Sequence, residues 1–284
     1  MSDRANLVYI CDGSLEGIFC CVFESYVRRE VPADILPDGE LTLFPVRQII
    51  SDEAKALRIH RSLERISAEV LEWTQTAYLS CVDGRELLIY QFIALAYRYG
   101  AKVTSMLADP VVSEVFKAVR AVRNEAHLLI EFLRFSDFGG ALVAEIEPKA
   151  LVLPYLKTHF AGRFPDETFF IFDLTHGLAL NYRPYEAVIQ PIDGFELPQA
   201  SGEERAFRNL WKRYYDTIAI EGRYNPKCRM THMPKHFWKH MTEFSDEFSL
   251  PGEARENRLP PFSTLPFPRR CIGSDLPHDQ HHGA

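Results

Sequence analysis

The sequence predicts an α+β fold, in which an antiparallel sheet of two hairpins plus an extra strand is packed by N-terminal and C-terminal helices. Three observations predict it. Apolar residues recur at helical spacing over residues 1–124, and helical spacing returns from residue 203 onward. Between these regions, apolar stretches of strand length are separated by glycine-containing turns. Helices followed by strands and then by helices favour α+β over a wound parallel sheet.

The chain has enough apolar side chains for a sizeable core, because 46% of its 284 residues are hydrophobic and 25% are charged. We expect one α+β domain over residues 1–244. Its parts are a helical half at about 1–124, a sheet half at about 125–192, and basic, aromatic helices at about 203–244. Residues 245–284 are rich in proline and charge and lack periodicity, so we expect a largely disordered tail.

Several classes of protein are excluded by what the sequence lacks. No apolar run approaches the roughly 18 residues that a membrane span needs, and the N-terminus does not read as a secretory signal. The cysteines are scattered rather than arranged as a disulfide framework, which indicates a reducing cytoplasm. Iron–sulfur, structural-zinc and phosphate-loop motifs are missing, so we expect no cofactor and no metal. The net charge of −7 argues against a protein that coats nucleic acid with its whole surface.

The chain opens as a strand, a turn and a helix. Residues 7–11 are a short apolar run, and Asp12, Gly13 and Ser14 follow it. Ser14 suits the N-cap of a helix whose apolar residues recur from Ile18 onward. A strand-to-helix turn can also hold an anion on its free N–H groups. These three residues are therefore interpreted as either a cap or an anion site.

Further helices are predicted before residue 125. The expected elements, in order, are a loop at 32–39, an edge strand at 41–46, a long helix from Ser51 to about Asp83, a buried helix at 86–100 and a helix from Pro110 to about Asn124. Asp109 and Pro110 form the strongest helix start in the chain, because an N-cap residue is followed by proline in the first turn.

The sheet is predicted from two hairpins and one more strand. The first hairpin pairs residues 128–135 with 141–147 across Gly139-Gly140, and the second pairs 168–174 with 178–183 across His176-Gly177. A short helix that begins with Pro154 lies between the hairpins. Residues 186–192 are expected to join the same sheet as a fifth strand.

Four titratable side chains interrupt this apolar region and are the candidate catalytic residues: Glu125, His127, His159 and Asp173. Burying such groups without partners is costly, so each must pair or face a cleft. A histidine near a carboxylate is the usual means of proton transfer near neutral pH. If the preceding helix ends at Asn124, Glu125 and His127 lie on one extended segment and can face the same side.

The same side chains have a structural interpretation. Arg134 with Asp173, and Arg163 with Glu125, could form buried ion pairs, with both histidines hydrogen-bonded in the core. The sequence leaves the catalytic and the structural interpretation open.

A second candidate site is the segment from Arg205 to His240, where cations alternate with aromatic residues. Cations for phosphates and ring faces for bases are what a nucleic-acid groove needs. Helical spacing places Trp211 and Tyr214 inward, so a solvated charged face over buried rings is the competing interpretation. The candidate nucleic-acid-binding residues, which include two from the sheet half, are Arg134, Arg163, Arg205, Arg208, Lys212, Arg213, Lys227, Arg229, Lys235 and Trp238; Arg223 and Lys239 add to the same charge.

The sequence also resembles a known family. The likeness runs through ICDGSLEGIFCCVFESY at the N-terminus, through VRNEAH, FLRF, AEIEP, THFAGR and FDL in the middle, and through LWKRYYDTIAIEGRYNPK and MPKHFWKHMTEF near the C-terminus. On these motifs, over about residues 7–244, it is similar to a bacterial family described as DNA metabolism proteins, whose domain has no assigned function.

The resemblance implies an accessory role in DNA repair or modification. Members of that family accompany a radical-SAM protein, and in some chains the domain precedes a uracil-DNA-glycosylase-like domain. This sequence contains neither module, so the resemblance implies a separate radical-SAM partner, with DNA as a second partner and no membrane. The matching positions, without assigned roles, are Asp12, Gly13, Glu125, His127, Arg134, His159, Arg163 and Asp173.

The sequence departs from the family pattern at Glu131, His176 and Arg229. The change at His176, where an arginine is common, puts in doubt any role that needs a permanent cation at that turn. Three hypotheses follow. The chain is an accessory DNA protein that acts with a radical-SAM partner; a metal-independent nuclease or glycosylase-like hydrolase that uses the Glu/Asp and His candidates; or a scaffold without catalytic activity.

Overall fold

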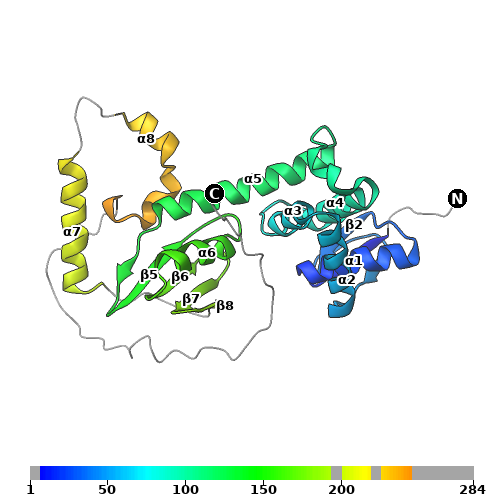
Figure 1. Ribbon diagram of the computed structural model, residues 1–284, viewed down its shortest axis with the longest axis horizontal. Helices are drawn as coiled ribbons and strands as arrows, with labels where there is room; N and C mark the ends of the chain where they lie inside the picture. Colours follow the sequence, from blue (N-terminus) through cyan, green and yellow to red (C-terminus); the bar gives the residue numbers. More distant parts are fainter. Residues whose placement is uncertain (1–6, 193–199, 219–224, 245–284) are drawn as a thin grey trace, which may run out of the picture. The chain divides into compact units, whose positions relative to one another are not determined.

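The computed structural model describes residues 7–192, 200–218 and 225–244. Figure 1 shows the order of the elements along the chain. The predicted disordered tail at 245–284 and Arg223 lie outside the described residues.

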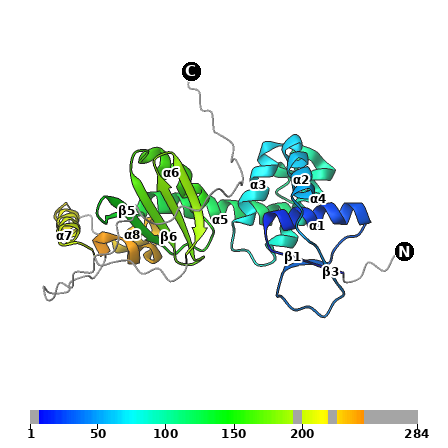
Figure 2. The ribbon, with the colours of Figure 1, turned by 90° about the horizontal axis from the view of Figure 1, so that it is seen from below.

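The N-terminal strands form a small parallel sheet. It consists of β1 (Val8–Cys11), β2 (Asp34–Pro37) and β3 (Val46–Gln48), in the order β2-β1-β3, and Figure 2 shows β1 beside β3. The loop predicted at 32–39 therefore contains a strand, and the edge strand predicted at 41–46 begins only at Val46. Proline has no N–H to donate, but the Pro45 carbonyl accepts the Val8 N–H at 2.9 Å, so strand pairing starts immediately after it.

Four helices follow or flank this sheet: α1 (Leu15–Arg28), α2 (Glu53–Ile66), α3 (Ala68–Tyr78) and α4 (Arg85–Tyr99), and the 3₁₀ helix η1 (Gly100–Ser105) continues α4. The single long helix predicted from Ser51 is two helices. Ser67 is extended, with φ −172° and ψ 137°, and its hydroxyl accepts the Glu69 N–H as the N-cap of α3. Serine favours caps over helix interiors because its side chain competes for backbone N–H groups, and here it separates α2 from α3.

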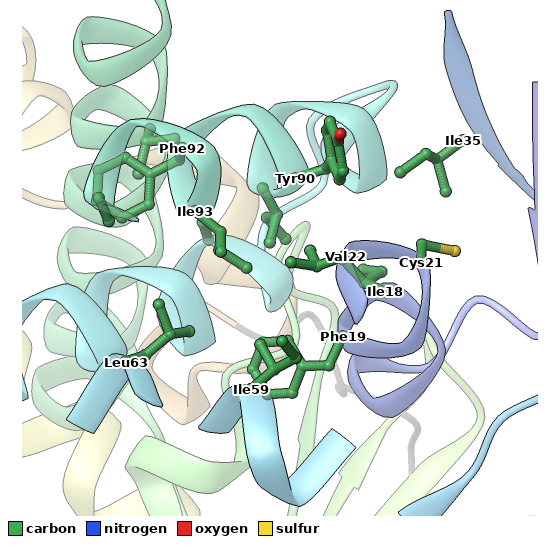
Figure 3. Packing of buried hydrophobic residues seen from close by; sticks show 14 of the residues in the cluster. Ile18, Phe19, Cys21, Val22, Ile35, Ile59, Leu63, Tyr90, Phe92 and Ile93 are labelled. Atoms are coloured by element: carbon green, nitrogen blue, oxygen red, sulfur yellow. The ribbon is translucent and has the colours of Figure 1, made fainter. Parts of the chain in front are cut away.

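The first core packs α1, α2 and α4 against β2. Figure 3 shows Ile18 and Val22 of α1, Leu63 of α2 and Ile93 of α4 converging, with Ile35 of β2 nearby. All five are fully buried. Each such side chain stabilises the fold by about 1.5–3 kcal/mol relative to an exposed one, which makes this cluster the principal stabilising feature of the N-terminal part.

Helix α5 (Pro110–Phe132) is longer than predicted. Asp109 caps it and Pro110 lies in its first turn, as the sequence indicates. It does not end at Asn124, however, and the predicted strand at 128–135 is wrong. The inward-facing positions Val112, Val115, Val119, Val122, Ala126 and Leu129 continue one three-four spacing without a break. A short apolar run fits a helix and a strand equally well, and here the continued stripe decides for the helix.

The second sheet is mixed. Its strands are β4 (Ser136–Asp137), β5 (Ala141–Ile146), β6 (Thr168–Asp173), β7 (Leu178–Arg183) and β8 (Glu186–Pro191), in that order. The predicted antiparallel sheet of two hairpins is therefore wrong, because β5 and β6 are parallel. Helix α6 (Leu153–Arg163) lies between them and supplies the crossover that parallel neighbours require. The β6–β7 hairpin and the addition of β8 are confirmed.

The C-terminal elements are α7 (Gly202–Thr217), α8 (Pro226–His232) and the 3₁₀ helices η3 (Lys235–His240) and η4 (Thr242–Phe244). Phe237 and Met241 join a second core with the end of α5, α6 and strands β5 to β7. None of the helices that the structure describes has the length and apolar character needed to cross a membrane.

Candidate functional site

Glu125 holds a loop. Because α5 continues past Asn124, Glu125 lies on a helix, and its two carboxylate oxygens accept the N–H groups of Lys149 and Ala150, each at 2.8 Å. These residues follow β5, so the carboxylate ties the chain after that strand to α5. The predicted pairing of Glu125 with Arg163 is wrong: Arg163 is exposed and its guanidinium lies over the Phe164 ring.

His127 points away from Glu125. Two residues apart on a helix, the side chains diverge, so the predicted shared face does not form. The His127 side chain is 71% exposed, and its Nε2 lies 3.1 Å from Glu131 one turn later. Exposed pairs of this kind contribute little to stability.

Asp173 is buried where β6 turns into β7. Its Oδ1 accepts the N–H groups of Thr175 and His176 at 3.0 and 3.1 Å, and its Oδ2 lies 2.6 Å from His176 Nδ1. Burial raises the pKa of the Asp173 carboxyl, and the hydrogen bonds from His176 oppose the rise without cancelling it. The predicted ion pair between Arg134 and Asp173 is wrong, because Asp173 contacts His176 and Arg134 contacts Glu243. The sequence singles out His176 as a turn residue and as a departure from the family pattern, but not as the side chain in contact with Asp173.

The fourth candidate, His159, lies on α6 and is half-buried. Burial, and then the nearby Arg163, lower its pKa. No hydrogen bond or ion pair joins His159 to Glu125, His127 or Asp173, nor any two of the four, within the described chain. Two hollows among the described residues, one bounded by α1 and α2 and a small one beside η3, are lined by other side chains. In the described ranges, no group of three His, Cys, Asp or Glu side chains could hold a metal ion.

Replacing Glu125 with alanine is expected to lower the free energy of unfolding by about 2–3 kcal/mol, because two backbone N–H groups lose a charged acceptor. Replacing His127 with alanine truncates an exposed side chain on the same helix and should change stability by less than about 0.5 kcal/mol. Urea denaturation of both variants measures the difference. Equal stabilities would contradict a structural role for Glu125.

The turn before α1 is a cap. The Ser14 hydroxyl accepts the Gly17 N–H at 2.9 Å, and Gly13 adopts φ +73°. Asp12 accepts hydrogen bonds from the N–H and hydroxyl of Ser14 and from the Ser51 hydroxyl. Burial alone would raise the pKa of Asp12, but these bonds lower it. A carboxylate in this position repels an anion, so the geometry favours the cap over the anion site.

Two of the candidate nucleic-acid-binding arginines, Arg134 and Arg208, form ion pairs and hydrogen bonds with other side chains of the chain. Arg134 Nη2 lies 2.8 Å from Glu243, whose carboxylate is only 2% exposed and also accepts the Trp211 indole N–H at 3.3 Å. Arg208 contacts Glu204 at 3.0 Å and the Ser136 hydroxyl at 2.6 Å. These contacts fasten α7 to η4 and β4, so both arginines are engaged in structure.

Other candidates form a stack of rings and cations beside α8. Trp238 and Phe244 are stacked at 4.5 Å, and the Arg229 guanidinium lies 5.0 Å from the Trp238 ring centre. Lys235 lies 5.9 Å from the same ring and is exposed, as is Lys227. Cation–π contacts of this type stabilise by about 0.5–1 kcal/mol at exposed sites.

His240, Glu145 and Glu147 form a group that sequence reasoning missed. The imidazole of His240 lies 3.8 Å from Glu145 and 3.5 Å from Glu147, so η3 is attached to the β5 region. Burial lowers the pKa of His240, and the two carboxylates oppose the change. The partners are about a hundred residues apart in sequence, and no local pattern signals the contact.

Helix α7 carries an exposed aromatic stripe. Phe207, Trp211 and Tyr214 are 62%, 42% and 53% exposed, so the prediction that Trp211 and Tyr214 point inward is wrong. Arg205 and Arg213 are exposed on the same helix, while Lys212 is half-buried. The rings of Trp211 and Tyr214 lie 5.7 Å apart. The helix therefore exposes both aromatic rings and cations to solvent.

Comparison with known proteins gives one family. The profile of DUF4130, a domain of unknown function, matches residues 83–243, which is more than half of the chain. The chain belongs to this family. The match to DUF4130 runs from just before α4 to Glu243 and so includes the mixed sheet and α7.

The other comparisons add little to the DUF4130 assignment. No curated protein matches the chain. A solved structure of a pGpG-specific phosphodiesterase, PggH from Vibrio cholrae, is 10% identical and aligns with 62% of this chain and 81% of its own, with a TM-score of 0.28. That score is too low to carry an argument about fold or function.

Proposed function

We propose that this DUF4130 protein is an accessory protein of DNA repair or modification, which binds single-stranded DNA through α7 and acts with a radical-SAM partner. One observation carries the proposal: Phe207, Trp211 and Tyr214 expose their rings on a helix that also exposes Arg205 and Arg213. An apolar stripe at helical spacing normally faces a core, so an exposed one suits a ligand with flat apolar faces.

The chemistry of the stripe matches a single strand. Unpaired bases stack on aromatic rings, and each such contact contributes about 1–3 kcal/mol. Arginine binds phosphate through its planar array of donors. The overall charge of −7 restricts binding to a local basic region of this kind. The radical-SAM partner rests on the resemblance in sequence, and copurification that survives nuclease treatment would support it.

The geometry favours this function over the hydrolase hypothesis. A general base must reach the proton that it removes, whereas both carboxylate oxygens of Glu125 and of Asp173 already accept hydrogen bonds from backbone or histidine groups. No histidine candidate contacts either carboxylate among the described residues.

A double substitution on α7, Arg205→Gln with Arg213→Gln, is expected to weaken binding of a fluorescein-labelled single strand. If the exposed Arg205, Arg213, Lys227 and Lys235 all contact phosphates, the slope of log K against log salt is about −3, and losing two charges makes it shallower by about 1.4. Tyr214→Leu should lower affinity about fivefold or more at unchanged slope. Fluorescence anisotropy at several salt concentrations measures both effects.

The control is Lys102→Gln with Arg120→Gln, which removes the same charge from exposed positions off α7. Unchanged affinity is expected there. If control and α7 variants bind equally well, or if the wild-type protein does not bind at low salt, the proposed function is wrong.

A further inference from the structure

A groove in the N-terminal part of the chain has the features of a second binding site. It is about 1060 Å³ in volume and lies between α1 and α2, with the end of α4 beside it. Figure 1 labels these helices. Three aromatic rings line it, from Phe23, Tyr26 and Tyr97, and so do three arginines of α2, Arg58, Arg61 and Arg65.

The three arginines lack acidic partners. Among the described residues, no carboxylate lies within 4 Å of Arg58, Arg61 or Arg65, although most of the ion pairs in this part of the chain do use arginine. Their spacing of three and then four residues places them along one face of α2. Like charges at this spacing repel one another, so an anion that bound all three would relieve an unfavourable arrangement. Glu64, which also lines the groove, leaves a net positive lining.

The rings are held in place and accessible. Tyr26 is 52% exposed, and its ring meets that of Tyr97 edge to face at 5.4 Å. The hydroxyl of Tyr97 on α4 is hydrogen-bonded to that of Ser62 on α2, which fixes the Tyr97 ring. The Arg58 guanidinium lies 5.2 Å from the centre of the Phe23 ring. The Tyr26 side chain is therefore a positioned flat surface beside a row of cations.

We propose that this groove binds a short segment of single-stranded nucleic acid, with a base stacked on Tyr26 and phosphates on Arg58, Arg61 and Arg65. Planar guanidinium groups suit phosphate oxygens, and exposed rings suit bases. Ligand pockets of about 300–1,000 Å³ hold molecules of drug size, so this groove has room for a few nucleotides. An acidic peptide would satisfy the arginines but would leave the exposed Tyr26 face without a matching group.

This inference extends the proposed function, since it gives the strand a second attachment, but it depends on a different set of residues. The α7 variant and a groove variant can therefore be measured separately. The groove variant is Arg58→Gln, Arg61→Gln and Arg65→Gln together; all three side chains are exposed, so the fold should be retained, and thermal melting checks this.

The experiment is anisotropy of the full chain with a fluorescein-labelled deoxythymidine strand of about 15 nucleotides. The groove variant should bind at least about tenfold more weakly, with a salt slope shallower by about 2. A control with Lys102→Gln, Arg120→Gln and Lys149→Gln has the same change in charge and should match the wild type. With a strand that contains 2-aminopurine, Tyr26→Leu should remove part of the fluorescence quenching caused by stacking.

Each outcome decides between the two sites. If the groove variant binds the strand as well as the control does, the groove proposal is overturned, while loss of binding in the α7 variant would still support the proposed function. If only the groove variant loses binding, the groove stands and α7 does not. Capture of polyglutamate instead of the strand, abolished in the groove variant, would overturn the nucleic-acid proposal in favour of an acidic peptide.

Discussion

The Glu243→Ala protein is expected to lose about 3 kcal/mol of unfolding free energy, more than any other change at an ion pair in the C-terminal part. The Glu243 carboxylate is 2% exposed and has two partners, the Arg134 guanidinium at 2.8 Å and the Trp211 indole N–H at 3.3 Å. Removing one member of a buried pair usually costs about 3–5 kcal/mol, because the other charge stays buried without compensation. Arg134 is 27% exposed and can regain some water, which favours the lower end of that range.

Thermal melting checks this, and a fall in Tm of roughly 6 °C or more is expected for a domain of this size. Glu243→Gln keeps an acceptor for Trp211, so its Tm should lie between those of the wild type and Glu243→Ala. Glu114→Ala is the control, because Glu114 is 56% exposed and its partner Lys117 is 65% exposed. Such a surface pair contributes about 0–1 kcal/mol. If Glu243→Ala were no less stable than Glu114→Ala, the buried pair would not hold α7 in place.

The Glu243 contacts also bear on binding. The Trp211 indole N–H donates to Glu243, which fixes the ring, although the residue is 42% exposed. Loss of Glu243 should therefore weaken DNA binding through the position of α7 as well as through stability. The Arg134 side chain, a predicted nucleic-acid contact, is instead the internal partner of Glu243.

Local patterns predicted the starts of α1 and α5 and the turn at the second hairpin. Ser14 and Asp109 cap helices as their neighbours indicate, because capping is decided within four residues. The β6–β7 hairpin follows from one strand, one glycine turn and a second strand. One kind of error occurs where a short apolar segment fits both the helical and the strand period, as at residues 128–135. The other occurs where strand pairing depends on a distant partner, as for β5 beside β6.

The candidate site was harder to predict than the fold. Glu125 accepts from residues 24 and 25 positions later, and Arg134 pairs with a glutamate 109 positions later. Sequence identifies these side chains as charged groups in apolar surroundings but cannot identify their partners, since the partners are brought close only by the fold. The exposed stripe of α7 has the same origin. Its spacing is that of a buried face, and only the structure places Tyr214 in solvent.

Asp173→Ala should be the second most destabilising of these changes, with an expected loss of about 3 kcal/mol. The carboxylate is fully buried and accepts from two backbone N–H groups of the β6–β7 turn, and each donor left without a partner costs about 1–3 kcal/mol. Asp173→Asn keeps an oxygen for both N–H groups, and its loss should be smaller than half of that. Guanidinium denaturation of the three proteins at one pH measures the series.

The dependence on pH separates burial of Asp173 from its contact with His176. Burial raises the pKa of the folded carboxyl above the unfolded value of about 3.9. Between these two pKa values, Asp173 is ionised in the unfolded chain and still protonated in the folded chain. The contribution of Asp173 to stability therefore falls as pH rises through this window and is constant above it. The Asn variant lacks this proton, so the advantage of the wild type over Asp173→Asn should be greatest at low pH and should shrink as pH rises. An advantage that grew with pH would mean that the charged pair with His176 outweighs the cost of burying the carboxylate.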